Sequence, residues 1–162
     1  AQRARPLLRE LRAVAVRGEG GVMGATHAIA VLFIGEIRPD VRAVVERMVR
    51  AAEKVTPIRH PLTVHVAPAP AVRGGDDGIG FGFTQVDTRT PGAPVHIALA
   101  GEPPDGCESP EDIADFLEST FAHELAHYEQ HRDGKPLQER GVEVRARNLR
   151  RLMGAVMAAR AA

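Results

Sequence analysis

The sequence contains no tryptophan, and aromatic residues make up only 4% of its 162 positions. Hydrophobic residues still account for 44% of the chain, so a sizeable core must be built from aliphatic side chains and alanine. A single cysteine, Cys107, excludes an internal disulfide framework and is consistent with a reducing cytoplasm. We therefore expect one domain spanning residues 1–162.

The chain also lacks an excess of charge of either sign. Its 21 basic and 21 acidic side chains cancel, so composition favours neither a nucleic-acid nor a membrane partner. The longest apolar run, residues 28–34, has the length of a strand and is too short to span a membrane. No signal-peptide pattern is present, and we expect a cytoplasmic protein. The chain starts at Ala1 without a methionine, which is compatible with further residues upstream.

One short motif carries a specific chemistry, the H-E-x-x-H sequence of residues 123–127. On a helix, residues i and i+4 lie one above the other, so His123 and His127 can face one divalent cation. Glu124 is close enough to reach a water molecule on that cation. In zinc peptidases such a glutamate takes a proton from the water while zinc polarises the scissile carbonyl. The motif predicts one catalytic zinc ion, His123 and His127 as its ligands, and Glu124 as general base.

The residues around the motif indicate that it lies well inside a helix. Apolar side chains recur at helical spacing before it, at Ile113, Phe116, Leu117 and Phe121. Ser109 followed by Pro110 is typical of a helix start, and residues 133–136 (Asp-Gly-Lys-Pro) are typical of a stop. The alternative interpretation is a polar surface helix that carries two unrelated histidines.

A catalytic zinc ion usually takes a third protein ligand. His131 continues the stripe of histidines, but three histidines at i, i+4 and i+8 rise too far along a straight helix to converge. The next expected helix, residues 137–160, offers Glu139 and Glu143, one turn apart on one face. We expect Glu143 to be the ligand, because the small Ala146 one turn later lets the two helices approach closely. Glu139 is the alternative ligand. For either residue, the alternative interpretation is an ordinary solvent-exposed glutamate that binds no metal.

Five further residues are weaker candidates. Tyr128 and His131 could stabilise the oxyanion of a tetrahedral intermediate. A Cys107 thiolate could occupy the open zinc position and hold the enzyme latent. His65 and His96 lie on expected strands that could border a cleft. For each residue, an ordinary structural role is the alternative.

The whole chain reads as an α+β domain. The expected elements are a basic amphipathic helix (2–17), a glycine-rich break (18–24), a strand (27–34), a helix (39–55), three strands (61–67, 79–88 and 95–100) and two helices (110–132 and 137–160). Gly80 and Gly82 indicate a bulge or a close backbone approach. This order predicts a small, mostly antiparallel sheet against which the final helices pack.

The strings HELAHYEQ at residues 123–130 and ERGVEVRA at residues 139–146 resemble the small gluzincin metallopeptidases. The minimal gluzincins and the ImmA/IrrE-type peptidases are the nearest, and the resemblance covers about residues 94–150. It is specific at H-E-x-x-H and at the E-x-x-A string on the following helix. The chain departs from the pattern at Arg147, where such families often have an acidic or amide residue, and it shows no helix-turn-helix.

The resemblance implies a zincin-like fold in which His123, His127 and Glu143 bind zinc and Glu124 is the general base. It also implies that the strand at residues 95–100 forms the rim of the cleft, where an extended peptide could pair.

The function predicted is that of a zinc metallopeptidase acting on a peptide or protein substrate. One alternative is a regulatory or binding module that holds zinc without catalysis. Another is a hydrolase that acts on a non-peptide bond. A nucleic-acid-associated protein would use the N-terminal basic helix and an arginine cluster at Arg140, Arg147, Arg150 and Arg151.

Overall fold

A computed structural model describes residues 29–74 and 78–161 of the chain. The helix expected at residues 2–17 and the break at 18–24 lie outside the described residues. The described elements are β1 (Ile29–Phe33), α2 (Pro39–Val55), β2 (Leu62–Ala67), β3 (Val72–Arg73), β4 (Ile79–Gly80), β5 (Gly82–Gln85), β6 (Val95–Ala100), α3 (Pro110–Arg132) and α4 (Val142–Ala161). At this level the α+β class is confirmed.

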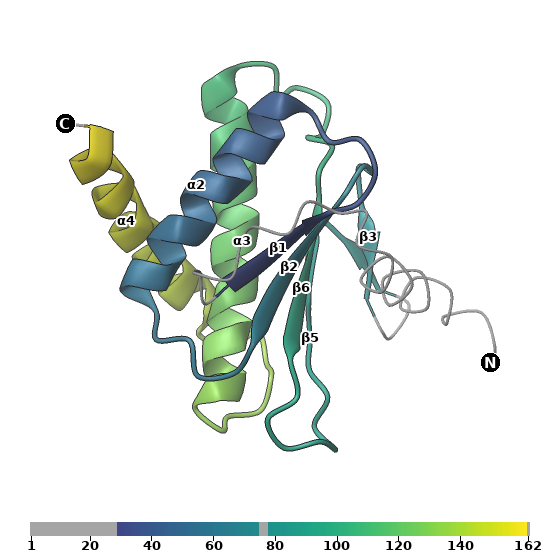
Figure 1. The fold of residues 1–162 in the computed structure, drawn as a ribbon, viewed down its shortest axis with the longest axis vertical. Helices are drawn as coiled ribbons and strands as arrows, with labels where there is room; N and C mark the ends of the chain where they lie inside the picture. The colour runs from purple at the N-terminus through teal and green to yellow at the C-terminus, as the bar shows by residue number, and fades with distance from the viewer. Residues whose placement is uncertain (1–28, 75–77, 162) are drawn as a thin grey trace.

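The main sheet is mixed, so the prediction of a mostly antiparallel sheet was wrong. Its strand order is β1-β2-β6-β5, and only β5 runs antiparallel to its neighbour. β1 pairs in parallel with β2, and β2 with β6. The reason is that α2 carries the chain back across one face of the sheet between β1 and β2, so the two strands run the same way (Figure 1).

The strand expected over residues 79–88 is divided. β4 pairs with β3 in a separate two-stranded sheet, whereas β5 pairs with β6 in the main sheet. The division falls at Phe81, between Gly80 and Gly82. The two glycines therefore mark the point where the chain passes from one sheet to the other.

Local signals correctly predicted most helix ends. Ser109 begins α3 with a capping box: its hydroxyl accepts from the amide of Asp112 at 3.0 Å, and the Asp112 carboxylate accepts from the amide of Ser109 at 3.3 Å. Helix α4, in contrast, begins at Val142 instead of residue 137, after Gly141 with a φ of 82°. Within the described residues, no helix combines the length and apolar content that a bilayer crossing requires.

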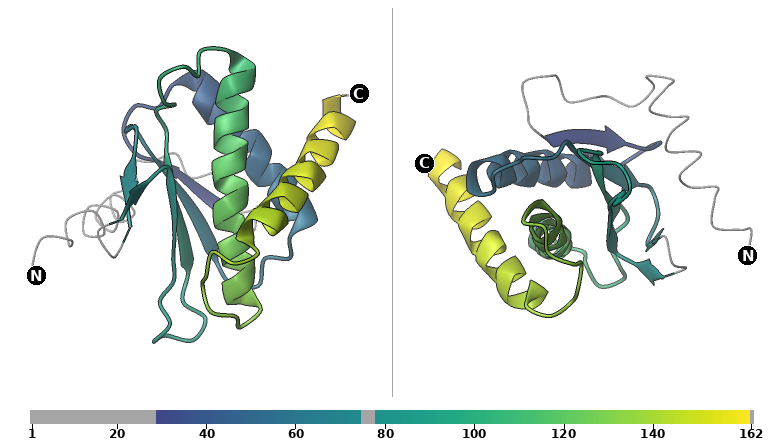
Figure 2. Two further views of the ribbon diagram at one scale, coloured as in Figure 1. Left: turned by 180° about the vertical axis from the view of Figure 1, so that it is seen from behind. Right: turned by 90° about the horizontal axis from the view of Figure 1, so that it is seen from below.

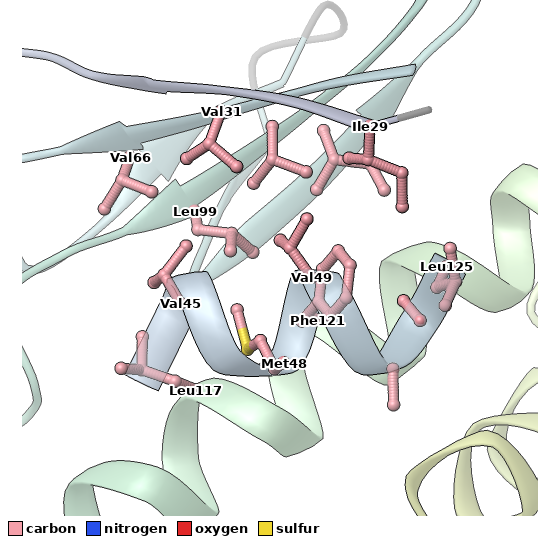
Figure 3. Packing of buried hydrophobic residues seen from close by; sticks show 14 of the residues in the cluster. Ile29, Val31, Val45, Met48, Val49, Val66, Leu99, Leu117, Phe121 and Leu125 are labelled. Atoms are coloured by element: carbon pink, nitrogen blue, oxygen red, sulfur yellow. The ribbon is translucent and has the colours of Figure 1, made fainter. Parts of the chain in front are cut away.

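The three described helices lie on one face of the main sheet, and α3 lies between the sheet and α4 (Figure 2). Every second residue of β1, β2 and β6 points into the core beneath them. Figure 3 shows these side chains, such as Val31 and Val66, facing Met48 of α2 and Phe121 of α3. As the composition predicts, the described core is mostly aliphatic; its aromatic members are Phe33, Phe121 and Tyr128.

An ion pair between a buried carboxylate and a half-buried guanidinium joins α3 to α4. The Glu129 side chain, 6% exposed, receives two hydrogen bonds from the Arg145 guanidinium, one of them at 2.7 Å. The Thr56 hydroxyl at the end of α2 donates to the same carboxylate at 3.1 Å. One carboxylate thus connects all three helices close to the H-E-x-x-H motif.

Replacing Arg145 with alanine should lower the free energy of unfolding by about 3 kcal/mol, because the Glu129 carboxylate loses its main partner while remaining buried. Arg132, 3.5 Å from Glu129, retains part of the compensation. Chemical denaturation measures the effect. The control is Arg147→Ala on the same helix, an exposed residue, which should change stability by less than about 0.5 kcal/mol. Equal effects of the two substitutions would contradict the prediction.

Candidate metal centre

His123 and His127 lie one turn apart on α3, and their rings meet edge to face with centroids 5.0 Å apart. The Nε2 atoms of both rings face a single carboxylate, that of Glu139. The distances are 3.3 Å from His123 and 3.2 Å from His127. One ligand atom from each of the three residues lies within 4.8 Å of the others. Within residues 29–74 and 78–161, no other group of three histidine, cysteine, aspartate or glutamate side chains is arranged so that it could hold a cation.

The donor set fits zinc. Metal–ligand bonds of about 2.0–2.1 Å in a tetrahedron place neighbouring donors roughly 3.3–3.5 Å apart. Nε2 of His123 lies 3.3 Å from Oε2 of Glu139 and Nε2 of His127 lies 3.2 Å from Oε1, so each ring is at about this spacing from one of the two carboxylate oxygens. Two imidazoles and one carboxylate are also the ligands of many catalytic zinc sites, which keep a fourth position for water. The side chain of His127 is 11% exposed and that of Glu139 76%, so the group is open to solvent on the Glu139 side.

The other nitrogen of each ring has a partner of its own. Nδ1 of His123 lies 3.1 Å from Oε1 of Glu143, and Nδ1 of His127 lies 3.0 Å from Oε1 of Gln130. An oxygen acceptor at Nδ1 favours a ring hydrogen there, so that Nε2 is the nitrogen that can give its lone pair to a cation. Both rings are therefore oriented to present Nε2 to the common centre.

The structure separates the two glutamates that the sequence offered as third ligand. Glu139 faces both Nε2 atoms, whereas Glu143, the residue preferred from the sequence, contacts Nδ1 of His123. Both glutamates were expected on one face of a helix that begins at residue 137. This expectation was wrong, because α4 begins at Val142 and does not include Glu139. Glu139 precedes α4 and lies in a turn, where its main-chain carbonyl accepts a hydrogen bond from the amide of Val142 at 3.1 Å.

Glu124 is buried beside the histidines, with 6% of the residue exposed. The Thr84 hydroxyl of β5 lies 2.7 Å from its Oε2 and 2.9 Å from its main-chain oxygen. Burial raises the pKa of the Glu124 carboxyl above its usual value, and the hydrogen bond from Thr84 opposes this only in part. A carboxyl with a raised pKa is better matched to exchanging protons near neutral pH.

The backbone of β5 can approach Glu124 because residue 82 is a glycine. A Cβ at Gly82 would lie 2.8 Å from Cγ2 of Thr120 and 2.9 Å from Cγ of Glu124. At Gly80 the nearest atom would be 3.6 Å away. The close approach predicted for this glycine pair is thus confirmed at Gly82.

A cavity of about 430 Å³ opens between α3, α4 and β5. Its lining includes His123, Glu124 and Glu143. Phe81, which lies between β4 and β5, and Arg147 of α4 also line it. Phe81 is 47% exposed and rests edge-on against the ring of Phe116, with centroids 5.1 Å apart. The Glu124 side chain therefore borders an open cavity.

No protein-family model matches the sequence, and no curated protein or solved structure matches it significantly.

Two of the weaker candidates have other roles. Tyr128 is fully buried, and its hydroxyl accepts from the amides of Arg59 and His60 and donates to the carbonyl of His60. It supports the loop before β2 and is not directed at the metal centre. His131 packs against the ring of His60, with centroids 5.0 Å apart. The geometry thus gives neither residue an oxyanion contact.

His65 and His96 lie on the face of the sheet opposite the helices, since they alternate with core residues of β2 and β6. Their ring nitrogens are 2.9 Å apart, and burial lowers the pKa of His65 to about 4. Neither lines the cavity beside Glu124. Cys107 precedes α3, and His123 lies about 20 Å further along that helix at 1.5 Å per residue. The structure does not bring this thiol to the centre.

The rim of the cleft also differs from the expectation. β6, the strand at residues 95–100, is paired on both sides, by β2 and by β5. The outer strand beside the motif helix is β5. Without the sheet order, the sequence could not show that β5 is inserted at the edge next to β6.

Sequence reasoning missed Thr84 and Gln130. Gln130 had a readable signal, because it lies three residues after His127 on a helix and so shares its face. Thr84 had none, since its contact with Glu124 depends on how β5 packs against α3.

The Gly82→Ala substitution should destabilise the protein by about 1–3 kcal/mol, because the added methyl group has no room between Thr120 and Glu124. The matched control is Gly80→Ala, whose methyl group would meet its nearest neighbours at an ordinary contact distance of 3.6 Å and which should be neutral or stabilising by up to about 1 kcal/mol. Denaturation midpoints of the two variants provide the comparison. The same sign of change in both would show that β5 does not press on Glu124 in this way.

Proposed function

We propose that this protein is a zinc-dependent metallopeptidase with a zincin-like fold. The observation that carries the proposal is the convergence of both Nε2 atoms of the H-E-x-x-H motif on one carboxylate, with the motif glutamate buried beside them. The mixed sheet with its antiparallel outer strand beside the motif helix supports the zincin-like assignment. The resemblance of the two sequence strings to gluzincins supports the peptide-hydrolysing chemistry.

His123, His127 and Glu139 would hold the ion through Nε2, Nε2 and a carboxylate oxygen. Glu143 then orients His123 from its Nδ1 side, the usual role of a carboxylate behind a ligating histidine. When bound, zinc supplies Lewis acidity to a water molecule and to the carbonyl of the scissile bond.

Glu124 moves the proton in this mechanism. Oε2 is held by the Thr84 hydroxyl, which leaves Oε1 to accept a proton from the attacking water. The same carboxyl then delivers that proton to the departing amine. Burial of Glu124 excludes bulk water from the exchange, and the hydrogen bond from the Thr84 hydroxyl of β5 keeps the carboxyl from rotating away.

The substrate proposed is a peptide or protein segment in extended form. It would enter the cavity bordered by Phe81, Gly82 and Arg147. β5 replaces β6 as the strand along which an extended chain could pair, because it is the outer strand on the side of the sheet where Glu124 and the cavity lie.

The Glu124→Gln variant should keep zinc at the wild-type ratio and lose peptide hydrolysis by about 10²- to 10⁴-fold, because the amide cannot accept the proton. Metal content by elemental analysis and cleavage of a fluorogenic peptide mixture measure the two effects. Glu111→Gln, an exposed change in the first turn of α3, is the control and should match the wild type.

Unchanged turnover in Glu124→Gln would rule out this mechanism. A wild-type protein that holds stoichiometric zinc and cleaves no peptide would instead support the non-catalytic zinc module.

The two glutamates can be distinguished by metal affinity. Glu143→Ala should weaken zinc binding about 10- to 100-fold, the usual effect of losing a partner behind a ligating histidine. Glu139→Ala should weaken it further, because a ligand itself is removed. Competition with a chelator of known affinity gives both values. The reverse order would identify Glu143 as the third ligand.

A further inference from the structure

Gln130 stands behind His127 and uses both ends of its side-chain amide. Its Oε1 lies 3.0 Å from Nδ1 of His127 and accepts from the main-chain amide of Gln138 at 3.2 Å. Its Nε2 donates to the main-chain carbonyl of Gln138 at 2.9 Å. One side chain therefore contacts a ring of the metal centre and the segment between α3 and α4.

The backbone of Gln138 determines which way this amide points. With the amide reversed, its NH₂ group would face the N–H of Gln138 and its oxygen would face the carbonyl. Both contacts would be repulsive, so Oε1 must be the atom near His127. A carbonyl oxygen only accepts, so Nδ1 of His127 must carry the hydrogen. Nε2, which lies 3.2 Å from Oε1 of Glu139, is then the nitrogen whose lone pair can be given to a cation.

The same contact restrains the third ligand. Gln138 directly precedes Glu139, and every residue from 133 to 141 is exposed, so the segment has no buried side chain to anchor it. Its main chain is instead tied to α3 at Gln130, whose carbonyl also accepts from the amide of Lys135 at 2.8 Å. Gln130 thus restrains the exposed segment at two points, one of them next to Glu139.

We propose that Gln130 is a positioning residue that couples the tautomer of His127 to the placement of Glu139 and thereby sets the zinc affinity of the centre. This inference rests on the proposed function only for the identity of the ion. The tautomer and the loop contact are properties of the metal-free protein. Gln130 contacts neither the ion nor the reacting atoms.

Two substitutions separate the two contacts. Gln130→Ala removes both. Gln130→Glu keeps an acceptor for Nδ1 of His127 but loses the donor to the Gln138 carbonyl. The control is Gln138→Ala, because only main-chain atoms of Gln138 meet Gln130 and its side chain is exposed.

The first measurement is the tautomer of His127, read from ¹⁵N NMR shifts of the metal-free, full-length chain. The wild type, Gln130→Glu and Gln138→Ala should all show hydrogen on Nδ1. In Gln130→Ala the hydrogen should shift towards Nε2, because the Glu139 carboxylate is then the acceptor that remains beside the ring. A purely structural role for Gln130 would leave the tautomer unchanged, so a wild-type tautomer in Gln130→Ala overturns the inference.

The second measurement is zinc affinity by chelator competition. Gln130→Ala should bind about 10- to 100-fold more weakly than the wild type, Gln130→Glu should fall between them, and Gln138→Ala should bind like the wild type. Wild-type affinity in Gln130→Ala overturns the inference while the proposed function stands. If Gln130→Ala does not fold, Gln130→Glu decides, and wild-type affinity in that variant overturns it.

A wild-type chain that binds no zinc would defeat the proposed function instead. In that case the NMR comparison alone decides whether Gln130 positions His127.

Discussion

The packing of α3 between the sheet and α4 is the constraint on which the rest of the structure depends. Phe121 and Leu125 belong to the core, and Leu149 and Met153 of α4 complete it from the other side. The ion pair of Glu129 with Arg145 sets the register of the two helices, since a buried carboxylate cannot slide away from its guanidinium without a large loss of stability. That register brings the start of α4 and the turn before it alongside the motif.

The centre combines rigid and exposed parts. His123 and His127 share one helix, so their separation is determined by helical geometry. Glu139 comes from a segment whose side chains are all exposed, and such a segment is precise only if its main chain is anchored. The contacts at the outer nitrogens serve this purpose: Glu143 and Gln130 orient the two rings, and Gln130 also anchors the segment. An exposed position for Glu139 and a well-defined arrangement of the three side chains are thereby compatible.

Local features of the sequence predicted the elements where the signal is itself local. The Ser109 capping box and the Asp133-Gly134 stop are formed by neighbouring residues, so α3 could be bounded without the fold. The alternation in β2 and β6 was likewise readable. The beginning of α4 was not, because residues 137–140 have helix-compatible side chains and the turn before Val142 is stabilised by contacts with α3.

By itself, the sequence determined the motif helix, the pair of histidines one turn apart and the glutamate between them, because spacing along a helix is a property of the chain alone. It also limited the third ligand to two glutamates. Only the tertiary structure decided that Glu139 faces both Nε2 atoms while Glu143 lies behind His123, that β5 borders Glu124, and that His65 and His96 lie on the far face of the sheet. These outcomes depend on strand order and on where α4 begins, which are set by packing between residues far apart in the chain.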